Sequence, residues 1–407
     1  MKLKSAHIFL AAASLATLTV LAGCGTNNSN ELSSPGYNVA DLVSQPQIVS
    51  LTLSPATATT HVGQTIPVNA NASLSNGTTA VVNSQVTWTS SDPSIASVSA
   101  TGVVSSNLPG TVTITATRGT VTANMQYTVS PFITRIFTSN STGTTISVFD
   151  LNATGAVTPV RTITGLSGAN QMIVSGQELF VANTGAGEVD VYYLQAEGAA
   201  TPLRRIKSTA FTAPTGIAIN NGELFVLSGT SISVFNTSDN GLTVSPKRAP
   251  ITGAVNTGLV STANGQLSVT DTEIIVPNLL DVRTFPKNAT GDVAPSRILT
   301  GPAALLVKAT SVAVSNGNIF VSDPGAAVPS VYQWPVAAAT TTAPTFTFTE
   351  PGGMLGPVGL LPVTATGNLW VTDTSSVRLY NSASVLQRSF TSASLGTPSG
   401  IVITGSF

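Results

Sequence analysis

Residues 214–253, PTGIAINNGELFVLSGTSISVFNTSDNGLTVSPKRAPITG, contain four short apolar runs separated by Gly, Asn-Gly or Ser/Thr-rich breaks. The runs GIAI, ELFVL, SISVF and PKRAPI show the alternation and the β-branched residues that favour strands over helices. Asn221-Gly222 predicts a tight hairpin between the first two runs, because both positions tolerate positive φ. We therefore expect one four-stranded antiparallel meander in this stretch.

The same meander recurs from residue 132 to residue 407. The third strand of each unit carries an Ile or Val and, three residues later, an aromatic residue, at Ile146/Phe149, Val189/Tyr192, Ile232/Phe235, Val282/Phe285, Val331/Trp334 and Val377/Tyr380. The second strand of each unit ends on a small polar residue, at Asn140, Asn183, Ser228, Asn278, Asp323 and Asp373. The aromatic residues are 43 to 50 positions apart, a period that predicts a β-propeller, here with six blades.

The fourth strand of most units opens with Pro-x-Arg, and a proline there fits an outer edge strand. These pairs are Pro159/Arg161, Pro202/Arg204, Pro246/Arg248 and Pro295/Arg297. The fifth unit has Phe346 in place of Arg, and the sixth has Arg388 at a shorter spacing. The first unit lacks a first strand, whereas the final PSGIVITGSF matches PTGIAINNG. We therefore expect residues 398–405 to complete the first blade and close the ring.

A signature in these units resembles a known family. The pattern G-x-V-x-P-x-R-x-I-x-G is followed by a P-x-G-I-A strand and an L-F-V-A-N strand. Residues 132–407 thereby resemble the NHL-type and related six-bladed propellers of bacterial exported proteins.

Residues 47–131 alternate differently, and about seven short strands predict a β-sandwich packed around Trp88. Its motifs are Val62-Gly63-Gln64-Thr65, VTWTSSDP at 86–93, IASV at 95–98, Gly102-Val103-Val104 and GTVTITA at 110–116. In these motifs the segment resembles the group 2 bacterial immunoglobulin-like domain of intimin- and invasin-type surface proteins. The resemblance implies a spacer or adhesive unit without catalytic residues. Asp92 is expected to cap a turn before Pro93, and His61 is expected to open a loop without a ligand role.

The first residues have the features of an export signal. Lys2 and Lys4 precede an apolar run at 8–20 that is too short to span a bilayer comfortably. Leu21-Ala22-Gly23-Cys24 resembles the lipobox of bacterial lipoproteins, which implies a signal peptide at 1–23 and lipid attachment at Cys24. Residues 24–46 are polar and read as a flexible tether. By the same resemblance, Gly25 permits sorting to the outer membrane.

Composition narrows the classes of function. Only 8% of the 407 residues are charged and the formal net charge is -1, which excludes disorder and argues against nucleic-acid binding. Cys24 is the single cysteine, so an intrachain disulfide is impossible. His7 lies in the signal segment, which leaves His61 as the only histidine of the mature chain. Most zinc sites and histidine-based triads are thereby excluded.

The six polar residues that end the second strands raise the question of a metal site. A ring of Asn and Asp could take calcium, and Asp323 and Asp373 are its candidate ligands, but Asn, Asp and Ser also accept turn N–H groups, which is the favoured reading. Some six-bladed propellers are calcium-dependent lactonases. Glu178, Glu223 and Glu273 fall at turns and are expected to be solvated, so no acid pair stands out. We expect no cofactor.

The function predicted from the sequence is that of a lipid-anchored, non-enzymatic envelope protein. Its propeller would bind a protein or glycan, with the membrane contacted through Cys24. The favoured face carries the second-to-third-strand loops, including loop 324–330. A calcium-dependent, lactonase-like hydrolase and a purely structural envelope protein remain the alternatives.

Overall fold

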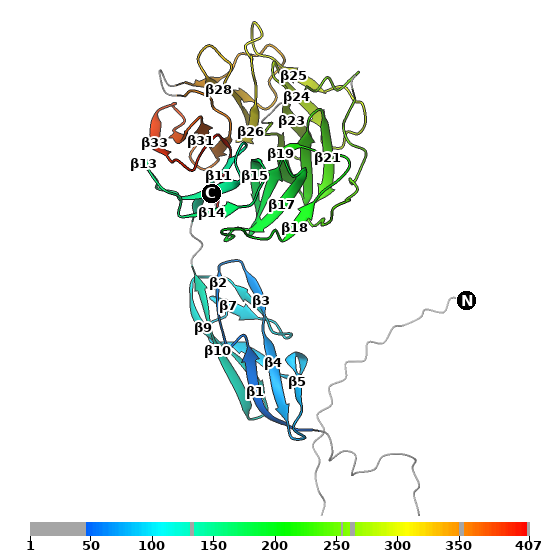
Figure 1. Ribbon diagram of the computed structural model, residues 1–407, viewed down its shortest axis with the longest axis vertical. Coiled ribbons are helices and arrows are strands. Elements are labelled where there is room, and N and C mark those ends of the chain that lie inside the picture. Colours follow the sequence, from blue (N-terminus) through cyan, green and yellow to red (C-terminus); the bar gives the residue numbers. More distant parts are fainter. Residues whose placement is uncertain (1–45, 131–133, 254, 261–264, 350–353, 405–407) are drawn as a thin grey trace, which may run out of the picture.

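The computed structural model describes residues 46–130, 134–253, 255–260, 265–349 and 354–404. The expected signal segment, Cys24 and nearly all of the tether lie outside these ranges. The described chain forms an immunoglobulin-like sandwich followed by a six-bladed propeller, as the sequence predicts (Figure 1). Among the described residues, no helix is long and apolar enough to cross a membrane.

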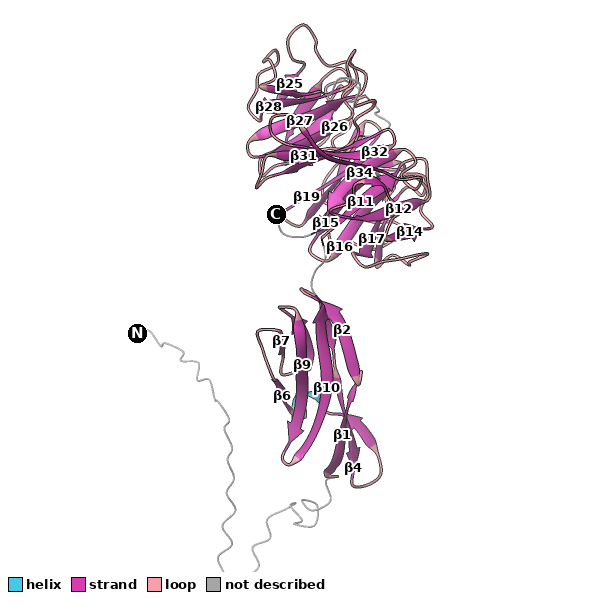
Figure 2. Cartoon of the chain, turned by 90° about the vertical axis from the view of Figure 1, so that its left-hand side faces the viewer, coloured by secondary structure: helices cyan, strands magenta, loops and turns pink. Residues whose placement is uncertain are grey.

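The sandwich contains three small sheets rather than the two that seven strands would build. Their orders are β1-β4-β5, β2-β10-β9-β6 and β3-β8-β7, and the long strands β9 and β10 run along the module in Figure 2. The elements are β1 (Ile48–Ser54), β2 (Thr57–His61), β3 (Thr65–Pro67), β4 (Asn69–Leu74), β5 (Thr79–Val81), η1 (Asn83–Gln85), β6 (Thr87–Ser90), β7 (Ala96–Val98), β8 (Val103–Ser106), β9 (Gly110–Arg118) and β10 (Val121–Ser130).

Trp88 and Tyr127 lie in the core of the sandwich, which contains no cysteine and therefore packs without the inter-sheet disulfide of antibody domains. The indole N–H of Trp88 donates to the carbonyl of Asn83 at 2.9 Å. The buried Tyr127 hydroxyl lies 2.9 Å from Thr60 Oγ1 and 2.8 Å from Ser106 Oγ, so its polar end is satisfied. Asp92 caps the turn as expected, because its carboxylate accepts both the N–H and the hydroxyl of Ser94. His61 ends strand β2 instead of opening a loop.

The propeller consists of six consecutive antiparallel sheets, described from the inner to the outer strand. Blade 1 contains β34 (Pro398–Ile403), β11 (Arg135–Asn140), β12 (Thr145–Asp150) and β14 (Arg161–Thr164); blade 2 contains β15 (Ala169–Ser175), β16 (Glu178–Asn183), β17 (Glu188–Tyr193) and β18 (Arg204–Ile206); blade 3 contains β19 (Pro214–Asn220), β20 (Glu223–Ser228) and β21 (Ser231–Asn236). Blade 4 contains β22 (Ser268–Val269), β23 (Glu273–Pro277), β24 (Val282–Pro286) and β25 (Arg297–Leu299); blade 5 contains β26 (Ser311–Ser315), β27 (Asn318–Asp323), β28 (Ser330–Pro335) and β29 (Phe346–Phe348); blade 6 contains β30 (Leu360–Val363), β31 (Asn368–Asp373), β32 (Ser376–Tyr380) and β33 (Leu386–Thr391).

The ring closes through the last strand, as the sequence predicts. Strand β34 pairs antiparallel with β11, with Ile403 opposite Ile136 and Val402 opposite Phe137. The hydroxyl of Thr404 accepts the N–H of Arg135 at 3.0 Å, which extends the pairing beyond the strand. Blade 1 is therefore built from both ends of the propeller sequence.

The Ile/Val-to-aromatic pattern of the third strands reflects packing between blades. All twelve side chains are at most 3% exposed. Within one strand the aliphatic residue faces one neighbouring blade and the aromatic residue faces the other, as Val189 and Tyr192 of β17 do. An odd spacing places two residues on opposite faces of a strand, and each blade needs an apolar surface on both faces.

The fourth strands are the least regular part of the ring. The run PKRAPI of blade 3 forms no strand, and only an isolated bridge joins Ile251 to Ile232. In blades 1, 2 and 4 the strand begins at the arginine, two residues after the proline, so the proline lies outside the ladder. Beside blade 6 a fifth strand, β13 (Gly155–Ala156), runs parallel to β33. Gly198, Gly241 and Gly291 make the equivalent parallel bridge to the preceding blade, which gives the first glycine of the repeated signature its role.

Candidate functional site

The polar residues that end the second strands bind the loops that enter each blade. Asn183 accepts the N–H of Ser167, Ser228 that of Ala213, and Asn278 that of Val260. In blade 1 the hydroxyl of Thr397, in the loop before β34, donates to Asn140 at 3.4 Å. In blades 2, 3 and 4 the polar residue accepts a backbone N–H of the incoming loop. In blade 1 a side-chain hydroxyl of the loop is the donor instead. The favoured structural reading of this position accounts for these contacts.

The two candidate metal ligands, Asp323 and Asp373, have the same role. The Asp323 carboxylate accepts the N–H groups of Val307 at 2.7 Å and Lys308 at 2.9 Å, and Asp323 is fully buried. The Asp373 carboxylate accepts the N–H groups of Leu355 and Gly356 and pairs with Arg378 at 3.4 Å. Within the described ranges, no three His, Cys, Asp or Glu side chains come together as a metal site would require.

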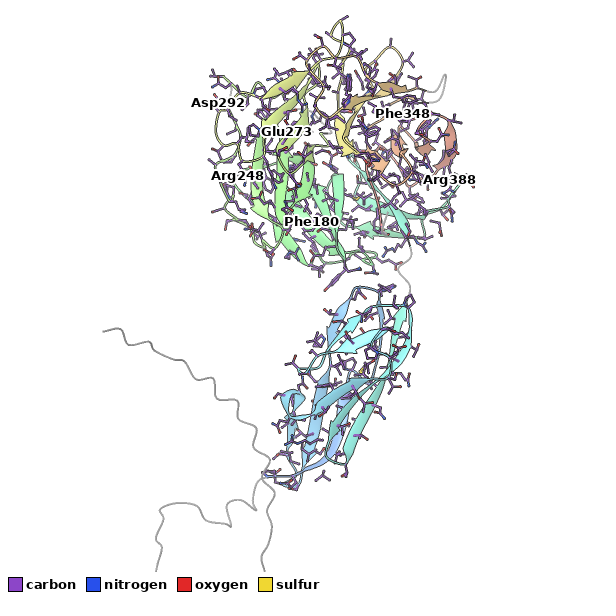
Figure 3. All side chains as sticks on the ribbon, turned by 180° about the vertical axis from the view of Figure 1, so that it is seen from behind. Phe180, Arg248, Glu273, Asp292, Phe348 and Arg388 are labelled. Atoms are coloured by element: carbon purple, nitrogen blue, oxygen red, sulfur yellow. The ribbon has the colours of Figure 1, made fainter. Side chains whose placement is uncertain are left out.

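The four Pro-x-Arg arginines and Arg388 connect neighbouring blades. Each donates to a backbone carbonyl just after the third strand of the next blade: Arg161 to Leu194 and Ala196, Arg204 to Thr237, Arg248 to Lys287, Arg297 to Val336, and Arg388 to Leu151. Figure 3 shows Arg248 and Arg388 on opposite sides of the ring. Blade 5 has Phe346 at this position, so its junction with blade 6 lacks the arginine contact.

Glu178, Glu223 and Glu273 are partly buried in ion pairs, which corrects the expectation of free, solvated side chains from their position at turns. Each opens a second strand and pairs with the arginine of its own blade, at 2.5 Å for Arg204–Glu178, 2.9 Å for Arg248–Glu223 and 3.0 Å for Arg297–Glu273. All three carboxylates are partly buried. The pairs hold the arginines in place for their contacts with the next blade.

Asp190 is a buried acid that the sequence analysis missed. It lies in β17, where one carboxylate oxygen accepts the amide of Asn183 at 2.8 Å. The other oxygen has no hydrogen bond and lies 3.7 Å from Nε of Arg205. Burial raises the pKa of Asp190 to about 6, against the opposing effect of Asn183. An alternation of Val and acid in EVDVYY was the only available signal.

The central channel is lined mostly by apolar side chains, with the polar Gln171, Gln266 and Ser268 among them. Its cavity has a volume of about 230 Å³ and is lined from the inner strands of all six blades, with Ile173, Ile219 and Leu361 among the lining residues. The Gln266 side chain connects blade 4 to blade 6. Its amide donates to the carbonyl of Leu360 at 2.9 Å, and its side-chain oxygen accepts the N–H of Leu360 at 3.1 Å. None of the described lining residues is titratable.

One face of the ring exposes apolar side chains over half of its circumference. We call the face where the second strands end, and where the chain enters each blade, the entry face. Each loop on it buries one apolar residue, in the order Leu395, Leu166, Phe211, Leu259, Leu306 and Met354 for blades 1 to 6. The residue that follows is Gly396, Ser167 or Thr212 in blades 1 to 3, but Val260, Val307 or Leu355 in blades 4 to 6.

Leu280 and Val328, from the second-to-third-strand turns of blades 4 and 5, extend this surface. Together with Val260, Val307 and Leu355 they are 42% to 66% exposed, and we call these five residues the apolar arc. The turn of blade 4 pairs with the loop of blade 5 through Leu279 and Ala309, so Leu280 and Val307 lie on adjoining segments. Loop 324–329, one residue shorter than expected because β28 begins at Ser330, contributes Val328.

Comparison with protein families identifies the first module. Residues 48–129 match the family described as bacterial Ig-like domain (group 2). That module is therefore a group 2 bacterial immunoglobulin-like domain. Comparison with curated proteins gives no match.

Comparison with solved structures gives distant similarities. A functionally unknown protein from Desulfotomaculum acetoxidans is 11% identical with a TM-score of 0.43, over 63% of this chain and 80% of the other. A protein provisionally assigned as a 6-phosphogluconolactonase from Bacteroides uniformis is 12% identical with a TM-score of 0.44, over 83% and 95%. AztD from Citrobacter koseri is 12% identical with a TM-score of 0.37, over 68% and 98%. At these values the comparisons carry no argument about activity.

Proposed function

We propose that the protein is a lipid-anchored envelope protein whose NHL-type propeller binds another protein through the apolar arc. The observation that carries the proposal is the asymmetry of the entry face. Six equivalent loop positions hold small or polar residues in three consecutive blades and exposed Val or Leu in the other three. Exposed apolar side chains that gather on one face of a module are typical of a docking site for a protein partner.

A protein partner is favoured over a glycan. Of the large hydrophobic side chains that are exposed in the described chain, Tyr193 is the one aromatic residue, whereas Trp88, Trp334 and Trp370 are buried. The arc itself contains only Val and Leu, which fill apolar pockets but provide no ring for stacking on a sugar. None of the described residues that line the central channel is titratable, which supports a binding module over a channel-centred hydrolase.

The test uses two matched substitutions. Leu280 of blade 4 is 61% exposed on the entry face, and Leu242 of blade 3 is 64% exposed in a third-to-fourth-strand loop. Leu280→Asp and Leu242→Asp therefore add the same charge on opposite faces of the ring. The purified mature chain is incubated with detergent-solubilised native envelope, and captured proteins are quantified by mass spectrometry. We expect a partner that wild type and Leu242→Asp retain and Leu280→Asp and Leu355→Asp lose. Equal recovery with all four chains would refute the arc as the binding surface.

Anchoring is tested separately. The lipobox residues lie outside the described ranges, so the proposal rests on the sequence at 21–24. A Cys24→Ala variant should lose the lipid anchor and move to the soluble fraction after cell breakage. Retention in the detergent-extractable membrane fraction would refute the anchor without affecting the proposal for the propeller.

A further inference from the structure

A hollow of about 240 Å³ lies between the immunoglobulin-like module and blades 1 and 2. His61 of the immunoglobulin-like module lines it together with Arg135, Arg161, Gln195 and Thr404 of the propeller, beside two apolar residues. Two hydrogen bonds join the modules beside it. The Gln177 amide donates to the carbonyl of Val62 at 3.2 Å, and the Gln64 amide donates to Oε1 of Gln195 at 3.4 Å.

The repeat shows what is unusual about this hollow. The first residue of the second strand is glutamate in blades 2, 3 and 4, where it neutralises the arginine of the fourth strand. In blade 1 the same position is occupied by Arg135. The strand from Arg135 to its terminal Asn140 is six residues long, as is the strand from Glu178 to Asn183 in blade 2. Arg161 therefore lies near a second arginine where its counterparts contact a carboxylate.

The remaining contacts hold Arg161 in place without neutralising it. Its guanidinium donates to two backbone carbonyls of blade 2 and lies over the ring of Phe137, 5.4 Å from the ring centre. Burial lowers the pKa of Arg161, the charge of the exposed Glu197 opposes this effect, and the neighbouring charge of Arg135 adds a smaller lowering. Arg135 pairs at 3.3 Å with Asp150, whose side chain is 57% exposed and therefore screened by water.

We propose that this hollow is an oxyanion site in which Arg135 and Arg161 bind a phosphate or carboxylate group, with His61 contributing from the other module. Each guanidinium group carries five N–H donors, and the contacts with backbone carbonyls and Asp150 use only some of them, so both arginines can still donate to an oxyanion. The site would belong to the junction, because its lining comes from both modules. A bound anion would then hold the immunoglobulin-like domain against blades 1 and 2. This inference does not depend on the apolar arc.

The decisive variant is Arg135→Glu, which gives blade 1 the residue that blades 2 to 4 already have. It is expected to fold, because Arg161 gains the partner that stabilises its counterparts. Binding of inorganic phosphate, glycerol phosphate and acetate to the mature chain is measured by calorimetry at constant ionic strength, with chloride as the background anion. Lys308→Glu makes the same change of charge on the entry face and serves as the control.

We expect saturable binding to wild type and Lys308→Glu, and a loss of roughly tenfold or more in affinity for Arg135→Glu. Tighter binding of glycerol phosphate than of inorganic phosphate would assign the site to a phosphate ester of a larger molecule, whereas the reverse would assign it to the free ion. His61→Ala should weaken binding several-fold. Unchanged affinity in Arg135→Glu, or binding that chloride displaces equally in all variants, would overturn the site, and unchanged affinity in His61→Ala would overturn its position at the junction.

Discussion

Removing the chain from Pro398 onward should unfold the propeller and leave the immunoglobulin-like domain folded. Strand β34 is the inner strand of blade 1, and its Ile401, Val402 and Ile403 are each at most 7% exposed. Burying one such side chain contributes about 1.5–3 kcal/mol, so the three together contribute roughly 5–8 kcal/mol. The whole stability of a domain is about 5–15 kcal/mol. The lost ladder to β11 and the exposed edge of β11 add to the deficit.

A graded variant shows that the effect comes from the closing strand and not from a damaged terminus. Ile401→Ala removes one buried side chain from β34 and should cost about 2–5 kcal/mol. Ile217→Ala is its matched control, because Ile217 occupies the same inner-strand position in the run PTGI of blade 3 that Ile401 occupies in PSGI. Similar losses in the free energy of unfolding for the two variants would show that β34 stabilises its blade as much as an inner strand that is continuous in sequence with its blade.

The assay is differential scanning calorimetry of the mature soluble chain, combined with limited proteolysis. The full-length chain should show transitions for both modules, and the truncated chain should keep only that of the sandwich, with proteolysis leaving a fragment that ends near residue 130. For a module of this size, Ile401→Ala should lower the midpoint by about 2–4 °C per kcal/mol. A truncated chain whose propeller melts within a few degrees of full length would refute closure by β34.

Three further variants test the contacts between and within blades by chemical denaturation. Arg204→Met should lower the free energy of unfolding by about 2–4 kcal/mol, because it leaves Glu178 and the carbonyl of Thr237 without their donor. Arg388→Met loses one carbonyl contact and should cost about 1 kcal/mol. Equal costs would refute a stabilising role for the Arg204–Glu178 pair. Asp190→Asn should raise the free energy of unfolding by about 2–3 kcal/mol at pH 7 and by almost nothing at pH 4. Because the pKa of Asp190 is raised to about 6, this group favours folding below its ordinary pKa and loses that contribution as the pH rises through 6. A difference in stability that does not depend on pH would count against a buried charge. Asp323→Ala should lower the free energy of unfolding by about 2–4 kcal/mol, because it leaves the loop N–H groups of Val307 and Lys308 unpaired. Calcium should leave the melting temperature of the wild type unchanged. A calcium-dependent rise that the variant abolishes would restore the metal-site hypothesis.

The features predicted correctly from the sequence are those that packing imposes on every blade. The third-strand pattern is visible because each sheet must be apolar on both faces, and the second-strand terminal residue because each incoming loop needs an acceptor. The fourth strands were harder to predict, since an outer strand is short and half exposed. In blade 3 it is reduced to the Ile251 bridge, although PKRAPI has the same Pro-x-Arg start as its neighbours.

The charged residues show why contacts were missed even where their residues were noticed. Glu178, Glu223 and Glu273 follow turns in the sequence, which suggests solvent, but the arginine that covers each one arrives some 25 residues later in the fourth strand. The signal was present as a correlation within the repeat, because the three blades with glutamate at the start of the second strand also carry Pro-x-Arg. The apolar arc left a similar trace, in the residue after each buried loop side chain, but exposure in a loop has no periodicity that could predict it.

A repeat protein contains its own comparison, because each blade solves the same structural problem. Positions that are alike in all six blades, such as the buried third-strand aromatics, are explained by that shared problem. Positions that differ between blades need another explanation, and two differences stand out in the described chain. One is the exposed Val and Leu of blades 4 to 6, and the other is Arg135 in blade 1, where blades 2 to 4 have glutamate and blades 5 and 6 have asparagine. Neither stabilises its blade, since exposed apolar side chains gain nothing from burial and paired arginines repel. They also lie in different parts of the ring, blade 1 beside the immunoglobulin-like module and strands β25 and β28 of blades 4 and 5 at the far end in Figure 1. The geometry thus separates a surface for a partner from a site at the junction, and Leu280→Asp and Arg135→Glu each change one of them and leave the other unchanged.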